Sequence, residues 1–518
     1  MAELIAPHVA AKPDEPALID DRGTVTWAEL DERVNRLING LRDAGLEAGD
    51  TIALMAGNQR EFFEVTAAAA HSSLVVIPVN WHWVTDELAY VLADSGATAI
   101  VVDQRWLDVA VEACERTPSV TLRIAVSDRP PAGFVSYEEL IAAASAAEPA
   151  DQGTGGPMFY TSGTTGFPKG VKGQLSTLGQ PMATSAFVAA AVGDMFGLPA
   201  GGVALICGPA YHSAQWVFSM LPLVNGATLV TQHQFDPAEL LALVDRHGVT
   251  NMHLVPTQFV RLLKLPGDVR AGFDGASLVQ VIHGAAPCPP QVKRSMIDWW
   301  GPKITEYYGG TEGGFLSKIT ADEWLAHPGS IGKAMPIVEV IITDDDGNRL
   351  GPNETGQIWF HNLMGGDFEY HNAPEKTAAA HLEPGVGTLG DVGYVDDEGF
   401  LFMADRKIDM IISGGVNIYP AEIEGVLVTH PAVADAAVFG VPHDEMGEEV
   451  KAAVELVPGV EASDELLAEL VQHTRAHLAG YKAPRSIDVV AVMPRNEAGK
   501  LQKRQLRDPY WADAGRSI

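Results

Sequence analysis

Residues 157–170 combine the side chains and the backbone freedom of a phosphate-binding loop. Four apolar residues predict a short strand, the next six residues from Thr161 are only Thr, Ser and Gly, and Lys169 closes the loop. Gly163 and Gly166 permit the positive φ angles of a tight curl. Backbone N–H groups, hydroxyls and an ammonium group then surround a space suited to phosphate oxygens. The pattern is neither a Walker loop nor G-x-G-x-x-G, and a flexible linker would need no preceding strand or terminal Pro-Lys-Gly.

This loop resembles the phosphate loop of the adenylate-forming superfamily. Its members include acyl-CoA synthetases, the adenylation domains of peptide synthetases, and luciferases. The resemblance implies that Thr161 also contributes to catalysis and to binding a metal ion. It implies that the phosphates of ATP are bound by Thr161, Ser162, Gly163, Thr164, Thr165, Gly166 and Lys169.

A second motif, Tyr308-Gly309-Gly310-Thr311-Glu312, resembles the Y-G-x-T-E element of this family. Its residue types suit an adenylate site, with an aromatic ring for the purine, a hydroxyl near the α-phosphate and a carboxylate for Mg²⁺. Because Mg²⁺ takes oxygen ligands and bridges phosphates, one carboxylate is sufficient. The resemblance assigns the nucleotide to Tyr308, Gly309 and Thr311, and Mg²⁺ and catalysis to Glu312. Taken alone, a Tyr beside Gly-Gly is usually a turn packed on the core.

A segment of small residues follows a predicted strand at 278–283. In the family, the segment that matches Gly284, Ala285 and Ala286 lies against the adenine, where small residues leave room for a flat base. His283 and Cys288 flank this segment. Without a nucleophile elbow or an orienting acid in register, we interpret both as local structure and not as a catalytic pair.

Two further motifs resemble the ribose site and the interdomain hinge of the family. The resemblance implies that Asp391 accepts hydrogen bonds from both ribose hydroxyls, which suits the two oxygens of a carboxylate. It implies that Arg406 reaches the ribose or a phosphate, and that residues 405–409 form the hinge. Two positions after the Arg, relatives commonly have Lys or Asp, whereas this chain has Ile408. We therefore assign no single pivot residue.

The C-terminal region contains motifs that resemble sites for two different half-reactions. Gly414 and Gly415 belong to a turn followed by Asn-Ile-Tyr-Pro, a form more similar to acyl-CoA synthetases than to peptide-synthetase domains. In relatives that use CoA, this turn lets the pantetheine arm pass close to the backbone. Lys500 ends a segment that resembles the P-R-x-x-x-G-K loop, whose Lys contacts the carboxylate and the α-phosphate during adenylation. The resemblance therefore predicts Lys500 as catalytic.

His212 lies in a segment that resembles the mouth of the acyl pocket in this family. The resemblance implies that His212 gates access of the thiol and takes part in catalysis. A His between Tyr and Ser near a Trp is more often packed as part of the structure. We also predict pocket walls at Trp216, Phe218, His233 and Val255.

Outside the motifs, signals for strands and helices alternate along the chain. Thr26-Trp-Ala-Glu29 has the form of a capping box that starts an amphipathic helix running to Gly45. Such alternation predicts an α/β fold with a mostly parallel sheet covered on both faces. Apolar runs predict buried strands near residues 51–55, 74–79, 98–103, 203–207, 227–231, 251–255 and 278–283, and further helices are predicted near 60–70, 86–94 and 237–247.

The character of the chain changes after about Ile331, where β-type segments with turn signals predict a β-rich subdomain. After Arg406, strand signals and a helix over 464–478, ended by Gly480, predict a separate α+β unit. We expect a large N-terminal domain of layered α/β/α sheets and a small, mobile C-terminal domain. The expected boundaries are 1–404 for the large domain, 405–409 for the hinge and 410–518 for the small domain.

The composition, with 47% hydrophobic and 20% charged residues, is that of a globular protein. The 35 Lys and Arg against 67 Asp and Glu give a formal net charge of −32, which disfavours nucleic acid and anionic membrane surfaces as partners. Three separated cysteines without C-x-x-C argue against a disulfide framework and suit a reducing compartment. The sequence shows no signal-peptide pattern and no uninterrupted run of about 18 apolar residues. We therefore expect a cytoplasmic protein without an integral membrane segment.

The motifs together predict an ATP-dependent carboxylic acid:CoA ligase, that is, an AMP-forming acyl-CoA synthetase. We expect ATP, Mg²⁺ and coenzyme A to be used in two steps, through an acyl-adenylate. One alternative keeps adenylation but uses another acceptor, namely an amine, a carrier-protein thiol or nitrite on the way to a diazo group. Another is a non-catalytic nucleotide-binding protein of this fold. The second alternative is disfavoured because the chain retains Lys169, Glu312, Asp391, Arg406 and Lys500.

The identity of the small-molecule acid is not determined by the motifs. Medium- or long-chain, aromatic, steroid and bile acids all stay open. Two segments, Pro78-Val-Asn-Trp81 and Tyr307-Tyr308-Gly309, resemble bacterial fatty-acid, steroid-side-chain and bile-acid CoA ligases, which suggests a role in fatty acid metabolism. The oligomeric state is also open, and homodimers are common in the family.

Overall fold

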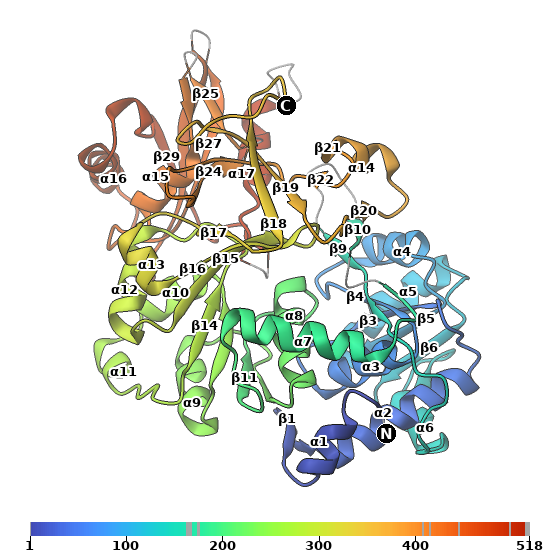
Figure 1. Cartoon of the computed structure of the whole chain (residues 1–518). Helices are drawn as coiled ribbons and strands as arrows, with labels where there is room; N and C mark the ends of the chain where they lie inside the picture. The colour runs from blue at the N-terminus through green and yellow to red at the C-terminus, as the bar shows by residue number, and fades with distance from the viewer. Residues whose placement is uncertain are drawn as a thin grey trace.

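The computed structural model describes residues 2–161, 168–173, 177–406, 409–413, 416–443, 446–496 and 499–512. Two α/β sheets and a β-rich part form the large N-terminal portion of the chain, and a smaller α+β unit follows it (Figure 1). This arrangement confirms the predicted fold class. The exact boundaries near residues 404–410 stay a prediction.

The first sheet has six strands in the order β7-β6-β5-β3-β4-β8, and all of its pairs are parallel. Every residue of the central strand β3 is buried, as expected for a strand covered on both faces. The strands are β3 (Thr51–Met55), β4 (Val75–Pro78), β5 (Ala99–Asp103), β6 (Leu122–Val126), β7 (Val135–Ser136) and β8 (Gly156–Pro157). The helices of this part are α2 (Trp27–Asp43), α3 (Arg60–His71), α4 (Thr85–Asp94), α5 (Leu107–Arg116) and α6 (Tyr137–Ala143).

Helix α2 begins with the predicted capping box. The backbone N–H of Glu29 donates to the Thr26 hydroxyl at 3.2 Å, and the backbone N–H of Thr26 donates to the Glu29 carboxylate at 2.8 Å. These bonds satisfy N–H groups that have no partner inside the helix. The apolar face of α2, including Trp27, Leu30 and Val34, is buried in the core.

The second sheet has nine strands in the order β17-β16-β15-β14-β13-β11-β12-β1-β2, parallel at its centre and antiparallel at both edges. Its strands are β1 (Pro16–Asp20), β2 (Gly23–Thr26), β11 (Val203–Ile206), β12 (Thr228–Thr231), β13 (Asn251–Leu254), β14 (Gln280–His283), β15 (Ile304–Gly310), β16 (Gly314–Thr320) and β17 (Lys333–Ala334). The helices are α1 (Ala6–Ala11), α7 (Met182–Phe196), α8 (Ser213–Val224), α9 (Pro237–His247), α10 (Pro256–Leu263), α11 (Gly267–Ala271), α12 (Pro290–Trp300) and α13 (Ala321–Ala326). The parallel strands β11, β13, β14 and β15 end at one edge, so the segments that follow them lie together there, the usual ligand edge of an open α/β sheet.

The β-rich part joins the two α/β sheets. One sheet of six strands contains β18 (Val338–Thr343), β19 (Gly356–Asn362), β21 (His381–Glu383), β22 (Val386–Gly387), β23 (Asp391–Val395) and β24 (Leu401–Arg406). A small sheet contains β9 (Phe159–Thr161), β10 (Lys169–Lys172) and β20 (Glu369–Tyr370), and α14 (Pro374–Ala379) lies beside it. The single strand predicted at 157–160 is therefore two strands, because the chain leaves the parallel sheet after β8 and enters the small sheet at β9.

The C-terminal unit has its own sheet and its own apolar core. It contains β25 (Ile411–Ser413), β26 (Val416–Ile418), β27 (Val433–His443), β28 (Gly447–Leu456), β29 (Ser486–Val490), α15 (Pro420–Leu427), α16 (Asp464–His477) and α17 (Lys503–Trp511). The prediction that Gly480 ends α16 is wrong. The helix ends at His477, its C-cap residue Leu478 is extended and packs on the core, and Gly480 begins a short 3-10 turn.

Two further expectations concern cysteines and membrane segments. Cys114, Cys207 and Cys288 are all free thiols, and the first two are buried. No helix among the described residues has both the length and the apolar character needed to cross a membrane.

Candidate active site

The predicted site residues gather around a cavity of about 2810 Å³ between the N-terminal sheets and the C-terminal unit. The side chain of Arg406 and residues Ser162, Gly163, Thr164, Thr165, Gly166, Gly414 and Gly415 lie outside the described parts of the structure. Gly284 does not line the cavity, but a Cβ atom there would lie 2.6 Å from Cε1 of the lining residue Tyr307. The wall includes Thr161, Lys169, His212, Ala285, Ala286, Tyr308, Gly309, Thr311, Glu312, Asp391 and Lys500. The structure thus brings the described motif residues together, while their individual roles stay predictions.

The end of β15 meets the β-rich part through a buried hydrogen bond. The Tyr308 hydroxyl donates to Oδ2 of Asp391 at 2.7 Å. In the antiparallel pair β23–β24, Asp391 lies opposite Arg406. The residues predicted to bind the purine and the ribose are therefore neighbours. Ala285, on the next strand end, has a φ of 66°, a strained value for a residue other than Gly that is often found at functional sites.

Gly309 is required by the hairpin that joins β15 to β16. The register shifts between Tyr308 and Gly309, and a Cβ atom at position 309 would lie 1.9 Å from the carbonyl oxygen of Gly314. Only a residue without a side chain fits this close approach. Gly309 thereby determines where the following residues, Thr311 and Glu312, enter the cavity.

A cluster of polar residues lies where the phosphate loop is expected to hold the phosphates of ATP. Nζ of Lys169 is 5.1 Å from the centre of the Tyr370 ring, and the Tyr370 hydroxyl donates to Glu312 at 3.0 Å. Burial and the positive charge of Lys376 lower the pKa of Lys169, and Glu312 opposes this shift. Sequence reasoning missed Tyr370 and Lys376, since neither belongs to a motif.

Glu312 offers a single carboxylate, which fits Mg²⁺ bound together with substrate phosphates and does not fit a metal ion held by protein side chains alone. Among the described residues there is no group of three or more His, Cys, Asp or Glu side chains that could hold a metal ion. Mg²⁺ is commonly bound by one or two carboxylates, water and substrate phosphates. A single carboxylate such as Glu312, beside a loop that binds phosphate, matches this pattern.

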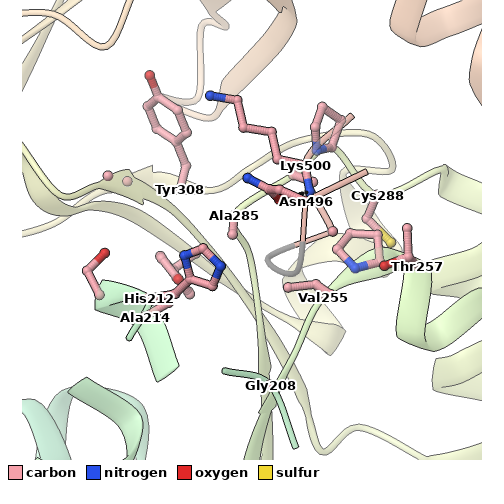
Figure 2. A pocket seen from close by; sticks show the side chains of 18 of the residues that line it. Gly208, His212, Ala214, Val255, Thr257, Ala285, Cys288, Tyr308, Asn496 and Lys500 are labelled. Carbon is pink, nitrogen blue, oxygen red and sulfur yellow. Dashed lines mark hydrogen bonds between the residues drawn. The ribbon is translucent and has the colours of Figure 1, made fainter. Parts of the chain in front are cut away.

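The segment that ends in Lys500 is docked against the large domain. A Cβ atom at Gly499 would lie 2.8 Å from the Thr257 hydroxyl and 3.1 Å from the Val255 side chain, so the backbone passes directly over the start of α10. The backbone N–H of Lys500 donates to the Asn496 side chain at 2.8 Å. Figure 2 shows the Lys500 side chain extended past Ala285 toward the side of the pocket where Tyr308 lies.

A bidentate ion pair supports this segment from within the C-terminal unit. Nε and Nη2 of Arg495 contact the two Asp435 carboxylate oxygens at 2.5 and 2.8 Å. Nη1 of Arg495 donates to the carbonyl oxygen of Gly499 at 2.7 Å. The planar guanidinium thus connects β27 to the residue that precedes Lys500.

His212 forms part of the wall at the start of α8 and is neutral at physiological pH. Burial, with a smaller contribution from His82, lowers the pKa of His212 to about 3. Its Nε2 atom is buried and has no hydrogen-bond partner within the described chain. A neutral ring of this kind can gate or shape the pocket, but it cannot supply a positive charge.

An apolar part of the wall comes from α7 and α8. Of the predicted pocket walls, His233 and Val255 line the cavity, whereas Trp216 and Phe218 do not. Trp216 packs against Phe159 and Phe218 stacks on His253, and both side chains are buried in the protein core. The apolar lining from the two helices is Phe187, Val188, Ala191, Val192, Met195, Ala214, Val217 and Leu221.

A buried ion pair lies behind the adenine segment. Nζ of Lys293 is 2.5 Å from Oε2 of Glu306, and both side chains are buried. The same carboxylate oxygen is 3.9 Å from Nε2 of His283. Burial raises the pKa of Glu306, and the Lys293 charge opposes this shift.

The sequence models of two protein families match most of this chain. The AMP-binding enzyme model matches residues 5–364, and the AMP-binding enzyme C-terminal domain model matches residues 422–500.

Curated relatives and solved structures match over nearly the full length. A fatty acid–[acyl-carrier-protein] ligase from Streptomyces coeruleorubidus is 30% identical over 526 residues, covering 99% of this chain and 96% of the relative. A feruloyl-CoA synthase from an Amycolatopsis species is 35% identical over 495 residues, covering 93% of each protein. The solved o-succinylbenzoate CoA synthetase from Bacillus subtilis, in complex with its acyl-adenylate intermediate, has a TM-score of 0.81 at 28% identity and covers 98% of each chain.

Proposed function

This chain belongs to the AMP-binding enzyme family, and on that premise we propose that it is an ATP-dependent carboxylic acid:CoA ligase. The observation that carries the proposal is the docked Lys500 segment. It extends a lysine into a cavity that also contains the Tyr308–Asp391 pair, Glu312 and an apolar wall. One cavity therefore combines a site for a nucleotide, a site for an acyl group and a cation between them.

In the first half-reaction the residues bind ATP and orient the acid. The 161–169 loop and Lys169 bind the phosphates, and Asp391 accepts hydrogen bonds from the ribose. A carboxylate oxygen of the acid attacks the α-phosphorus, the bond to the bridging oxygen of the β-phosphate breaks, and pyrophosphate leaves. Lys500 stabilises the negative charge that develops between the two reactants. Glu312 and Thr161 would hold Mg²⁺, which offsets phosphate charge when bound.

In the second half-reaction the thiol of CoA attacks the acyl carbon, its proton is lost, and AMP leaves with the electrons of the broken acyl–oxygen bond. We assign passage of the pantetheine arm to the Gly414–Gly415 turn and gating to His212. Lys500 and this turn belong to the same C-terminal unit but act in different steps. A rotation of the unit about residues 405–409 would bring each to the cavity in turn.

Pyrophosphate release with Mg·ATP over a panel of carboxylic acids, with and without CoA, tests this function. We expect release with some acids and sustained turnover, with a thioester product, only when CoA is present. Sustained turnover that does not depend on CoA would point to another acceptor, such as an amine or nitrite. A protein that binds ATP but releases no pyrophosphate with any acid would contradict the proposal and favour a non-catalytic role.

A carrier-protein thiol is the second candidate acceptor. The fatty acid–[acyl-carrier-protein] ligase that matches 99% of this chain favours it. CoA and a carrier protein present the same pantetheine thiol, so the chemistry of the second half-reaction is unchanged. Replacing CoA by a pantetheine-loaded acyl-carrier protein in the same assay, at matched concentration, distinguishes the two acceptors by the relative kcat/KM.

A further inference from the structure

Three polar side chains form a buried hydrogen-bonded series in the cavity wall. Gln215 on α8, His253 on β13 and Tyr307 on β15 all line the cavity and are at most 6% exposed. Nε2 of Gln215 is 3.0 Å from Nδ1 of His253, and Nε2 of His253 is 3.2 Å from the Tyr307 hydroxyl. Gln215 stands in the segment around His212 but has no predicted role there, and His253 belongs to none of the motifs.

The carbonyl oxygen of His253 determines the direction of these bonds. Nε2 of Gln215 lies 3.2 Å from that oxygen, which can only accept a hydrogen bond. The amide group must therefore present its NH₂ side, and Nδ1 of His253 accepts the second hydrogen. The amide is also tightly packed, since a Cβ atom at Gly208 would lie 2.5 Å from Nε2 of Gln215.

It follows that the hydrogen of His253 is on Nε2. Burial lowers the pKa of His253 to about 3, so the ring is neutral and carries one hydrogen. Because Nδ1 accepts from Gln215, Nε2–H donates to the Tyr307 oxygen. The tautomer is thus set by the neighbours of the ring.

The hydroxyl hydrogen of Tyr307 is left without an acceptor among the residues that the structure describes. Burial raises the pKa of Tyr307, so the phenol keeps this hydrogen. The surrounding groups are aromatic: the rings of Phe196, Phe218 and Phe315 lie 6.1, 5.7 and 5.1 Å from that of Tyr307. A hydroxyl donor left unpaired in such surroundings costs about 1–3 kcal/mol.

Tyr307 lies between the proposed nucleotide and acyl sites. It precedes Tyr308, and a Cβ atom at Gly284 would lie 2.6 Å from Cε1 of Tyr307, so its ring packs directly against the adenine segment. Phe315, which also lines the cavity, contacts the ring from another side. A bound acyl group would therefore pass close to this donor.

We propose that the Tyr307 hydroxyl donates a hydrogen bond to an oxygen atom on the body of the acid substrate, so that the enzyme selects oxygen-bearing acids over plain hydrocarbon acids. The inference rests on the proposed adenylating function and narrows its substrate class. The acceptor is a keto, ether or hydroxyl oxygen distinct from the reacting carboxylate. Gln215 and His253 are positioning residues that orient the donor.

The test compares matched acids in the pyrophosphate assay. The probes are decanoic acid and its oxo derivatives, and 3-phenylpropenoic acid and its 2-, 3- and 4-methoxy derivatives. For at least one oxygen position, we expect wild-type kcat/KM to exceed that of the parent acid by about tenfold. Tyr307→Phe should abolish this preference, because it removes the hydroxyl donor and keeps the ring.

Tyr137→Phe is the matched control, because it removes another buried phenol hydroxyl that lies away from the cavity. The control should retain the wild-type preference. Equal kcat/KM for parent and oxygenated acids in the wild-type enzyme, or a preference that survives Tyr307→Phe, overturns the inference and leaves adenylation standing. In that case a water molecule satisfies Tyr307. Absence of pyrophosphate release with every acid overturns the proposed function and this inference together.

Discussion

At the scale of single residues, Lys500 is the group on which the proposed adenylation depends most directly. Lys500→Ala keeps the docked backbone of Gly499 but removes the ammonium group. We expect adenylate formation, measured as pyrophosphate release, to fall by at least about 100-fold, as when one stabilising donor is lost from a reaction site. Thioester formation from a supplied acyl-adenylate and CoA should be nearly unchanged. If both half-reactions fell equally, the assignment of Lys500 to the first step alone would be wrong.

The buried Lys293–Glu306 pair gives a second prediction at this scale. Lys293→Met leaves an unpaired carboxylate in the core and should lower the free energy of unfolding by about 3–5 kcal/mol near pH 7. Burial already raises the pKa of Glu306 above its ordinary value of 4.5, and loss of Lys293 raises it further. A raised carboxyl pKa favours the folded state below about pH 4.5, and this advantage is lost as the pH rises through the folded pKa. The difference in the free energy of unfolding between wild type and variant should therefore grow from pH 5 to pH 8.

Thermal unfolding of wild type and variant, followed by tryptophan fluorescence at several pH values, measures this difference. The double variant Lys293→Met/Glu306→Leu lacks the carboxyl group and serves as the control. Its loss of unfolding free energy should be smaller than that of the single variant and independent of pH. A single variant whose deficit is constant from pH 5 to pH 8 would show that Glu306 is not the titrating group.

Motif residues could be predicted because their types and spacing carry the chemistry in one stretch of chain. Tyr308, Glu312 and Asp391 are examples, and the structure places them around one cavity. The roles of Gln215, His253 and Tyr370 could not be predicted in this way, although Gln215 stands in the motif around His212. Their partners lie 38 or more residues away in the sequence, so their meaning arises only when separate strands and helices are brought together.

At the scale of secondary-structure elements, the β15–β16 hairpin positions Tyr308, Thr311 and Glu312 of the proposed nucleotide site. Gly309→Ala would place a methyl group against the carbonyl oxygen of Gly314, so the hairpin must open or shift. We expect ATP affinity, measured by titration calorimetry, to fall by about tenfold or more, since displacement of binding groups by about 1 Å is costly. Gly267→Ala, at an open position at the start of α11, is the control and should bind ATP normally. Normal ATP affinity in Gly309→Ala would show that the hairpin geometry is not needed.

Strands covered on both faces could be predicted at this scale, whereas helices such as α7 and α8 could not. Continuous apolar runs identified β3, β5 and β11, because parallel strands inside a layered fold are apolar on both faces. Helix α7 follows Pro181 and has no acidic residue in its first turn, and α8 contains Pro222. Their sequences are apolar on most sides, so they lack the polar face and capping signals by which a helix is detected.

At the scale of the whole molecule, the C-terminal unit is docked on the large domain partly through one lysine. Nζ of Lys264 on the large domain donates to the backbone carbonyl oxygen of Val433 at 2.7 Å and is 3.3 Å from that of Ala434. Lys264→Met should weaken this orientation and lower the rate of pyrophosphate release by about tenfold, since a charged hydrogen bond contributes roughly 1.5–3 kcal/mol. Thioester formation from a supplied acyl-adenylate should change little, because we assign that step to another orientation.

Lys303→Met provides the matched control, since Nζ of Lys303 also donates to a backbone carbonyl, that of Gly275, but within the large domain. The control should retain both half-reactions. If the rate of pyrophosphate release fell equally in the two variants, the docking contact would have no specific role. The presence of two domains could be predicted from the change in sequence character, but this docking could not, since it uses backbone carbonyl groups that any residue provides.

The native cysteines, two of them buried and Cys288 partly buried, should give little background in chemical labelling. Burial raises the pKa of Cys114 to about 11 and that of Cys207 to about 12, and it raises the pKa of Cys288 as well. Thiolates are the reactive form, so the native cysteines should react slowly with maleimides at neutral pH. Single cysteines introduced at the exposed positions Asp322 on α13 and Glu465 on α16 would then carry a donor and an acceptor dye without removal of any native cysteine. Energy transfer between the dyes should change when CoA is added to the adenylate-loaded enzyme, and constant transfer would mean that the C-terminal unit does not rotate.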